Sequence, residues 1–480
     1  MSTLFSMPRR NAVRLFCCGL LFARAVHALD GEFDASFADG GRELVSVSPD
    51  HSDVGSALAV LPDGRILMAG SCSHVESTPA GSETVPSFCA TRLREDGSYD
   101  SSFGPGGLGY VRFDHFSQWP RFSYFQDMAL LRDGRALFVG GVSGDAQLLV
   151  AVLAADGTSL DTSIGGGNGY VTFDIGKTSG FSRLRIAGDG KILVAQTVYG
   201  VNDNQDFAVV RLLADLSGLD TGFGNHGIAS IAFDLGGPGG DDTDVATSLA
   251  VQEDGKIVVG GYGFTTAAGA PPHLEIELAR LLPSGQRDPS FGSDGDGRLH
   301  YAILQESTAN DLAVDAQGRI VVGGATQPAS AEDSEWFFHR LLSDGSRDPT
   351  FNAGQPRVVR VRPNITGPLQ ALARLLVTDD AIIGVGDVLH DSNSTQRYFG
   401  AAKLRPDGVL DTTFANQGHL FGSYESSGNY DDLTHAVALT SRGLLIGGGA
   451  QVTNPDGSGG DAFFGIARLI YDHIFSDTFE

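Results

Sequence analysis

The chain has 480 residues, with 58 acidic and 33 basic side chains and a formal net charge of −25. It lacks the Lys and Arg excess that binds a phosphate backbone, which excludes nucleic acid as a partner. The 29 Phe and the 41 % hydrophobic content also exclude a disordered acidic tail. Glycine, at 65 residues, is nearly twice its usual share of roughly 7 %. Such a surplus indicates many tight turns between short strands.

The first 28 residues have the layout of a secretory signal peptide. Met1 to Arg14 carries three Arg and no acid, an apolar run covers 15–23, and Val26-His27-Ala28 offers a small residue for cleavage. The apolar run is too short to span a bilayer, which needs about 20 residues. A lipoprotein anchor on Cys17 or Cys18 is the alternative. We expect a signal peptide over 1–28, export, no membrane span, and a mature chain with a formal charge of −29.

Two cysteines, Cys72 and Cys89, remain in the mature chain. In an oxidising compartment such a pair predicts a disulfide across one long loop. Two separate buried thiols are the alternative. No metal-type spacing of Cys is present.

An Asp-x-x-Phe motif recurs along the mature chain at intervals of 59 to 68 residues. A variant, Asp161…Ile164, fills the one gap in the series. Seven units of this kind account for residues 29–480 as a single domain. The motif stands at Asp34…Phe37, Asp100…Phe103, Asp220…Phe223, Asp288…Phe291, Asp348…Phe351 and Asp411…Phe414.

Each unit predicts four short strands. A Gly-bearing turn and an alternating stretch such as 110–114 follow the motif, and a second run such as 246–251 comes next. An Asp-Gly turn, as at Asp254-Gly255, opens a third apolar run, and a fourth run closes on a basic residue and Leu, as at Arg280-Leu281. Asp-Gly between apolar runs is a strong hairpin signal. Four-stranded units that bury their faces against one another predict a seven-bladed β-propeller, with a β-solenoid as the alternative.

The ends of the mature chain both carry the junction between units. Residues 30–37 hold an inter-unit turn and the motif, and residues 469–479 align with 93–103. The junction sequence therefore occurs eight times, whereas the rest of the unit occurs seven times. We expect the N-terminal strand and the last unit to share one blade and close the ring.

The combination of Asp-x-x-Phe-Gly, Asp-Gly-(Arg/Lys)-Ile and Ala-Arg-Leu-x-x-Asp-Gly at about sixty residues resembles the delta-60 repeat family of bacterial β-propellers. The resemblance covers residues 30–479. It implies a propeller that is exported or surface-associated in a bacterium, with a periplasmic, cell-surface or extracellular location and an undefined molecular role. This sequence departs from the pattern locally. The departures are Ile164, Val152, Gln317, Asp380 and Arg442.

The repeated Asp, Phe and Arg are interpreted as structural. An Asp in a turn accepts a backbone N–H two residues on, and the Phe can wedge between adjacent blades. Function is therefore expected at residues that do not repeat. Three loop insertions stand out, at 73–87, 235–244 and 453–461.

The acidic Gly-rich segments 235–244, 294–296 and 454–461 are weak candidates for calcium, since hard cations take oxygen ligands from such loops. Solvated turns are the alternative, and the metal ligands stay unknown. A cluster of aromatic residues suggests either a packed blade or an exposed contact for a sugar or protein. Its members are Phe116, Trp119, Phe122, Tyr124 and Phe125.

No catalytic motif of the zinc-protease, serine-hydrolase or phosphate-binding kind is present, so no catalytic or cofactor-binding residue is assigned. The leading hypothesis is a monomeric, exported, non-catalytic propeller that binds or scaffolds a protein, peptide or glycan. The alternative is a hydrolase or lyase with a site of unrepeated acids and His at the central channel, with or without calcium.

Overall fold

A computed structural model describes thirteen segments of the chain. They are 30–47, 53–78, 81–113, 122–142, 147–200, 204–236, 242–265, 272–328, 333–367, 370–392, 396–425, 430–453 and 459–471. The segment 1–28 expected to be a signal peptide lies outside them. Among the described residues no helix is long and apolar enough to cross a membrane.

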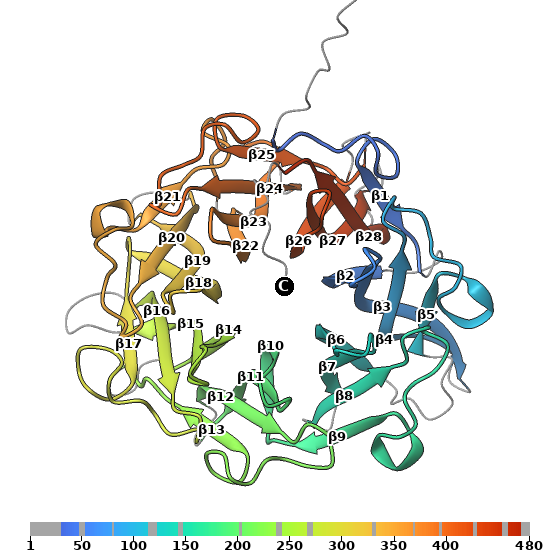
Figure 1. Cartoon of the computed structure of the whole chain (residues 1–480), viewed down its shortest axis with the longest axis horizontal. Coiled ribbons are helices and arrows are strands. Elements are labelled where there is room, and N and C mark those ends of the chain that lie inside the picture. The colour runs from blue at the N-terminus through green and yellow to red at the C-terminus, as the bar shows by residue number, and fades with distance from the viewer. Residues whose placement is uncertain are drawn as a thin grey trace, which may run out of the picture.

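The described residues form seven four-stranded antiparallel sheets arranged around a central channel, which confirms the predicted seven-bladed β-propeller (Figure 1). We number the blades in chain order. Blade 1 is β2 (Asp53–Val60), β3 (Ile66–Thr78), β4 (Gly81–Leu93) and β5 (Tyr110–Arg112); blade 2 is β6 (Ser123–Leu130), β7 (Ala136–Val142), β8 (Gln147–Leu153) and β9 (Tyr170–Asp174); blade 3 is β10 (Thr178–Ile186), β11 (Ile192–Tyr199), β12 (Gln205–Leu212) and β13 (Ile228–Ile231).

The remaining blades have the same inner-to-outer order. Blade 4 is β14 (Asp244–Val251), β15 (Ile257–Thr265), β16 (His273–Leu281) and β17 (Arg298–Tyr301); blade 5 is β18 (Glu306–Val314), β19 (Ile320–Gln327), β20 (Glu335–Leu341) and β21 (Arg357–Val359); blade 6 is β22 (Ala371–Val377), β23 (Ile382–Leu389), β24 (Arg397–Leu404) and β25 (His419–Gly422); blade 7 is β26 (Tyr430–Leu439), β27 (Leu444–Thr453), β28 (Gly459–Leu469) and β1 (Arg42–Val45). Three short 3-10 turns, η1 (Pro105–Gly107), η3 (Gly165–Gly167) and η5 (Asn352–Gly354), follow the wedge residues.

The sequence unit and the blade are out of phase by one strand. The first run of each unit is the outermost strand of the preceding blade, because it pairs with the fourth run of the unit before it. This offset closes the ring. β1 pairs with β28 in an antiparallel register from Arg42↔Ala467 to Val45↔Phe464, as the junction at both ends predicts.

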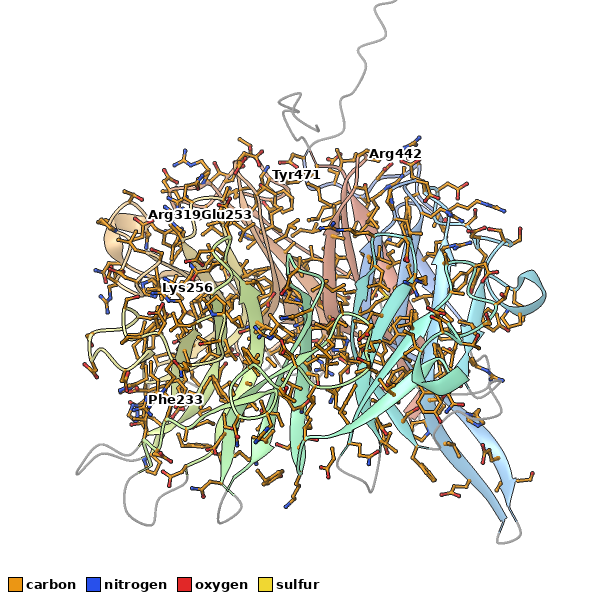
Figure 2. The ribbon with its side chains drawn as sticks, turned by 60° about the horizontal axis from the view of Figure 1, so that its bottom comes forward. Phe233, Glu253, Lys256, Arg319, Arg442 and Tyr471 are labelled. Carbon is orange, nitrogen blue, oxygen red and sulfur yellow. A yellow bond between two sulfur atoms is a disulfide. The ribbon has the colours of Figure 1, made fainter. Side chains whose placement is uncertain are left out.

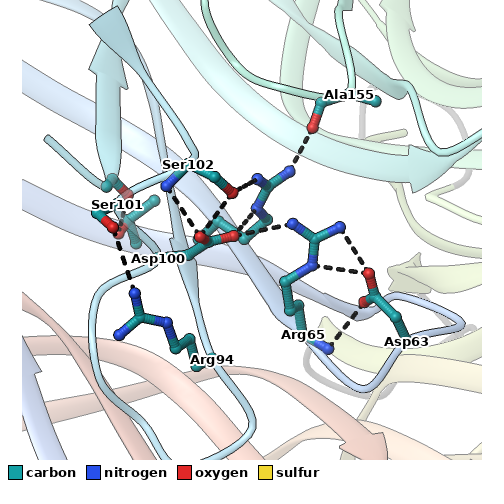
Figure 3. A network of polar contacts seen from close by, with 10 residues as sticks. Asp63, Arg65, Arg94, Asp100, Ser101, Ser102 and Ala155 are labelled. Atoms are coloured by element: carbon teal, nitrogen blue, oxygen red, sulfur yellow. Dashed lines mark hydrogen bonds and ion pairs between the residues drawn. The ribbon is translucent and has the colours of Figure 1, made fainter. Parts of the chain in front are cut away.

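Each Asp-x-x-Phe motif forms an interblade clamp with the basic residue that ends the fourth run (Figure 3). Asp100 Oδ1 accepts the Ser102 N–H at 3.0 Å, and its Oδ2 accepts Arg92 Nε at 2.6 Å. Arg92 Nη1 also donates to the Ala155 carbonyl in the next blade. The repeated acids and bases are therefore used for packing, and they are not available as a catalytic ring.

The Phe of each motif packs on the glycine of the next blade's turn. Gly157 has φ +69°, and a Cβ there would lie 2.4 Å from the Phe103 ring. Where the wedge is Ile164, the equivalent turn residue is Leu216, which has φ +57° and is buried in the same cluster. The smaller wedge leaves room for the larger turn residue, so the two departures from the repeat compensate each other.

The departures at the Asp-Gly turn between the first two strands of a blade are also compensated by side chains. The Asp315 carboxylate accepts the N–H groups of Gln317 and Arg319, two positions upstream of the usual Asp. In blade 7, Thr440 Oγ1 accepts the N–H of Gly443 at 2.9 Å. These turns keep the hairpin geometry because a nearby oxygen replaces the missing carboxylate.

The two faces of the ring differ in what they carry. Since strands alternate in direction, the turns and clamps of all blades lie at one face, here the turn face, while the insertions 73–87, 235–244 and 453–461 lie at the other, here the insertion face. Figure 2 shows Lys256, Arg319 and Arg442 near the turn face and Phe233 near the insertion face, from which the β3–β4 hairpin projects. The three insertions therefore share one face.

The insertion 73–87 is an ordered extension of the β3–β4 hairpin rather than an irregular loop. The register continues from Ile66↔Leu93 to Thr78↔Gly81. Cys72 and Cys89 are joined by a disulfide at the base of the extension, with their Cα atoms 5.9 Å apart. The bond therefore ties the two arms where the hairpin leaves the body of the blade.

Replacing Cys72 and Cys89 together by Ser is expected to lower the free energy of unfolding by about 2–3 kcal/mol, because a closed loop of this length limits the unfolded chain. Urea unfolding of the double variant, compared with the oxidised parent, measures the loss. Reduction of the parent should reproduce it. A difference below about 0.5 kcal/mol would show that strand pairing alone holds the hairpin.

Candidate functional site

The central channel is lined by the innermost strand of each blade, and each of these strands has a β-bulge or irregularity at the same level. A bulge leaves one residue outside the ladder and turns its side chain. In six blades this residue is polar, namely Ser56, Gln126, Ser182, Thr247, Asn310 and His435.

Four of these polar bulge residues bind backbone carbonyl groups of neighbouring blades. Asn310 Nδ2 donates to the Leu372 carbonyl at 2.8 Å, and Gln126 Nε2 donates to the Gly180 carbonyl at 2.9 Å. Thr247 Oγ1 donates to the Ala309 carbonyl at 2.7 Å, and His435 Nδ1 lies 2.9 Å from the Gly55 carbonyl. A carbonyl only accepts, so His435 carries its proton on Nδ1. Gln126 Oε1 in turn accepts a hydrogen bond from Ser182 Oγ, so the acceptor atoms that stay available include Asn310 Oδ1 and His435 Nε2.

The residue after the bulge stands six positions before the Asp-Gly turn position in every unit, and its type differs from blade to blade. In blade order it is Ala57, Asp127, Arg183, Ser248, Asp311, Arg374 and Ala436. The carboxylate of each Asp accepts a hydrogen bond from the backbone N–H of the residue that follows the Arg in the next blade. Asp127 accepts the Leu184 N–H and Asp311 accepts the Leu375 N–H, both at 2.8 Å.

The two arginines at this level sit in the channel wall. Arg183 is 7 % exposed. Burial, together with the charge of Arg374, lowers the pKa of Arg183 to about 9. The Arg374 Nη1 donates to the Ala373 carbonyl at 2.7 Å.

A cavity of about 410 Å³ lies at this level of the channel, toward the insertion face. Both arginines, the bulge side chains Ser56, Gln126, Thr247, Asn310 and His435, and the rings of Phe125 and Tyr262 line it. Burial, with the charges of Arg374 and Arg183, lowers the pKa of His435 to about 4 and keeps its ring neutral. The cavity thus holds two guanidinium groups and a neutral imidazole, with the carboxylates of Asp127 and Asp311 close enough to Arg183 to favour its charge.

Asp387 is the one carboxylic acid among the lining residues that the structure describes. Burial raises its pKa to about 6, although the Thr434 N–H donates to it at 2.8 Å. Hydrolysis of glycosides ordinarily uses two carboxyl groups on either side of the scissile bond. The described lining does not supply such a pair.

The acidic segments considered for calcium are distributed as follows. In 235–244, Asp242 accepts the Gly236 N–H at 2.9 Å, and Asp241 lies outside the described residues. Asp296 is paired with Arg298 at 2.7 Å. Residues 454–458 of the third segment also lie outside. Across the described ranges, no group of three or more His, Cys, Asp or Glu could hold a metal ion.

The aromatic cluster divides between core and surface. Phe125 is buried and packs edge-on against Phe88, with ring centroids 5.4 Å apart. Tyr124 is 46 % exposed on the neighbouring position of the same strand. Phe122 is partly buried, and Phe116 and Trp119 lie outside the described residues.

A buried pair of carboxyl groups in blade 4 has no counterpart in the other blades. Asp244 and Glu277 are both fully buried, and a Cβ on Gly263 would lie within 2.7 Å of oxygens from each. The residues that occupy the position of Glu277 elsewhere are apolar or glycine: Cys89, Leu149, Ala208, Phe337, Gly400 and Gly465. Burial raises the pKa of Asp244 to about 7 and, with the charge of Asp244, raises that of Glu277 well above its usual range.

This pair predicts a loss of stability as the pH rises. The folded protein holds protons that the unfolded chain releases near pH 4, so the stabilisation is complete below about pH 4 and is lost through about pH 7. Glu277→Gln removes one titrating group at nearly constant size. The melting temperature of this variant should fall less than that of the parent between about pH 5 and pH 8. Equal slopes in both proteins would contradict the prediction.

The channel arginines were not among the residues that sequence reasoning selected. Aligning the second run of each unit on the turn six residues later would have placed Asp127, Arg183, Asp311 and Arg374 at one position among small residues. Charge at an otherwise small, inward position is the signal that could have found them.

The family model described as "Domain of unknown function (DUF5122) beta-propeller" matches residues 187–223, 252–291 and 317–351. Each matched segment runs from near an Asp-Gly turn position to the wedge Phe of the same clamp. The match supports a β-propeller repeat family, and the delta-60 name stays an expectation. No curated protein matches the chain.

Solved structures with a similar fold include a polysaccharide lyase, Uly1, at 11 % identity and a TM-score of 0.45, covering 92 % of this chain and 96 % of that one. Drosophila Semaphorin 2a has 9 % identity and a TM-score of 0.43, and the match covers 86 % of this chain and 76 % of that chain. The GH93 alpha-L-arabinofuranosidase of Fusarium graminearum has 14 % identity and a TM-score of 0.39, and the match covers 80 % of this chain and 98 % of that chain. At these values none of them assigns an activity to this chain.

Proposed function

We propose that this protein is an exported binding module whose ligand site is the cavity of the central channel. The observation that supports the proposal most directly is the place of the unrepeated residues. The lining residues of the cavity lie in the half of the channel nearer the face that carries all three insertions, while the turn face carries the repeated clamps. The cavity volume of about 410 Å³ lies in the range of ligand pockets, roughly 300–1,000 Å³.

Binding is favoured over hydrolysis because the described lining contains one carboxyl group, Asp387, where hydrolysis of glycosides ordinarily uses two. The expected ligand is a glycan, peptide or protein segment that enters from the insertion face. Export through the segment 1–28 and a monomeric state belong to the same proposal, which requires no cofactor; calcium at the acidic loops is the alternative.

Filling the cavity tests the proposal. Ala373 lines the channel, so Ala373→Trp should block ligand entry. Val409 is 39 % exposed on the turn face, so Val409→Trp is a matched control that adds the same side chain elsewhere. Both variants and the parent would be applied to glycan and peptide arrays after their melting temperatures are compared.

The proposal expects array signals that Ala373→Trp loses and Val409→Trp keeps. Signals that Ala373→Trp keeps would place the site outside the channel and overturn it. Chemical conversion of a bound compound, detected by mass spectrometry, would overturn the non-catalytic role. Chelation by EDTA separately tests calcium, because a bound ion would raise the melting temperature that the chelator then lowers.

A further inference from the structure

We infer that the channel cavity binds an acidic saccharide, with the sugar carboxylate held between Arg183 and Arg374. The inference rests on the proposed function and names the class of ligand.

The two arginines of the cavity favour an anion as ligand. Arg183 and Arg374 occupy equivalent positions in blades 3 and 6, so their guanidinium groups enter one cavity from different sides of the ring. The charge of Arg374 disfavours that of Arg183, whereas the carboxylates of Asp127 and Asp311 favour it. An anion between the two guanidinium groups relieves their repulsion. Guanidinium groups also present paired N–H donors that match the two oxygens of a carboxylate.

Hydrogen-bond acceptors near the arginines determine which other groups the ligand carries. The amide N–H of Asn310 and the Nδ1–H of His435 are used on carbonyl groups of adjacent blades. What these two lining residues keep for a ligand is Asn310 Oδ1 and the unprotonated Nε2 of His435, both of which accept hydrogen bonds. A ligand that matches them carries hydroxyl donors as well as a carboxylate. That combination describes a uronic acid better than a simple fatty acid.

Two aromatic rings form part of the cavity wall. The Tyr262 ring lines the cavity, and Phe125 lines the wall beside Gln126. Sugars present apolar C–H faces that pack on aromatic rings, while their hydroxyl groups meet polar side chains. The chain as a whole has a net charge of −25, so it does not attract polyanions non-specifically. Binding of an acidic sugar would therefore report the local arginines.

Isothermal titration calorimetry of the full chain tests the inference with glucuronate and galacturonate, as monomers and short oligomers, against glucose and galactose. We expect the uronates to bind at least about tenfold more tightly than the neutral sugars. Arg374→Gln should weaken uronate binding by about tenfold or more, and Arg374→Lys by less, because Lys keeps the charge without the paired donors.

Arg185→Gln is the matched control, since Arg185 lies two residues from Arg183, pairs with Asp127 at 3.9 Å and is not among the residues lining the cavity. This variant should bind uronates as the parent does. Melting temperatures of all variants show whether the fold is kept, and Arg374, which is only half-buried, is chosen over Arg183 for that reason.

Equal affinity for acidic and neutral sugars would overturn the carboxylate inference and leave a channel binding site in place. Absence of sugar binding, or uronate binding that Arg374→Gln leaves unchanged, would also overturn it. Loss of array signals in Ala373→Trp would still support the proposed function in either case. Conversion of the uronate to an unsaturated product would overturn the non-catalytic role while supporting the carboxylate inference.

Discussion

Replacing Asp288 by alanine is expected to lower the free energy of unfolding by about 3–5 kcal/mol, because it leaves Arg280 as an uncompensated buried charge. The side chains of Asp288 and Arg280 are 4 % and 3 % exposed and lie 2.9 Å apart. Asp288 also accepts the Ser290 N–H at 3.0 Å. The Arg280 guanidinium reaches the Ser343 carbonyl in the next blade, so the loss affects the contact between blades as well.

Urea unfolding of Asp288→Ala and of Asp254→Ala gives the comparison. Asp254 belongs to the same blade, but its side chain is 57 % exposed and pairs with Lys256 at 3.4 Å. An exposed pair contributes little, so this control should lose about 1 kcal/mol or less. Comparable losses in the two variants would contradict the clamp as a main stabilising contact.

The Asp288 clamp should also weaken in acid. Burial opposes ionisation of Asp288, but hydrogen bonds from Ser290 and the charges of Arg280 and Lys256 outweigh it and lower the pKa to about 2. The stabilisation is therefore present above the unfolded pKa of about 3.9 and is lost as the pH falls toward 2. The stability difference between parent and Asp288→Ala should shrink over that interval, and a constant difference would contradict this reading.

Gly157→Ala is expected to lower the free energy of unfolding by about 2–5 kcal/mol, from backbone strain at a positive φ and from overpacking against Phe103. The added Cβ would lie 2.4 Å from the Phe103 ring, which is itself 2 % exposed and has no room to retreat. The wedge would have to shift, and with it the contact between blades 1 and 2.

Gly134→Ala separates the two contributions. Gly134 has φ +86°, but its nearest heavy atom to an added Cβ is 3.7 Å away. This control carries backbone strain alone and should lose about 1–2 kcal/mol. Thermal and urea unfolding of both variants measure the difference. Equal losses would show that the Phe wedge does not require glycine opposite it. That result would contradict the explanation given above for the pairing of Ile164 with Leu216 in blades 2 and 3.

Local chemistry in the sequence was enough to predict the blades. Each Asp-Gly turn, each apolar third run and each Asp-x-x-Phe motif depends on neighbours within a few residues, so the repeat could be read without a structure. The sites of Asp100 and Arg92 were predicted as structural, and the closing of the ring through β1 and β28 followed from the junction at both ends. Ile164 was recognised as a departure from the repeat, whereas its compensation by Leu216 was found only in the structure.

The channel site depended on tertiary structure. Arg183 and Arg374 are 191 positions apart, and only closure of seven blades turns the same face of each inner strand toward one axis. The bulges decide which side chain enters the channel, since one extra residue reverses the alternation of a strand. The same holds for Asp244 and Glu277, whose burial over Gly263 needs the packed sheet.

The sequence by itself therefore determined the repeat, the strand pattern and the ring, because these follow from contacts between residues close in the chain or repeated along it. Tertiary structure alone decided which unrepeated residues meet, which face carries the insertions, and that two arginines line one cavity in a chain of net charge −25. The physical reason is that turns and strands encode local distances, whereas the electrostatics of a cavity depend on charges that closure of the ring brings together.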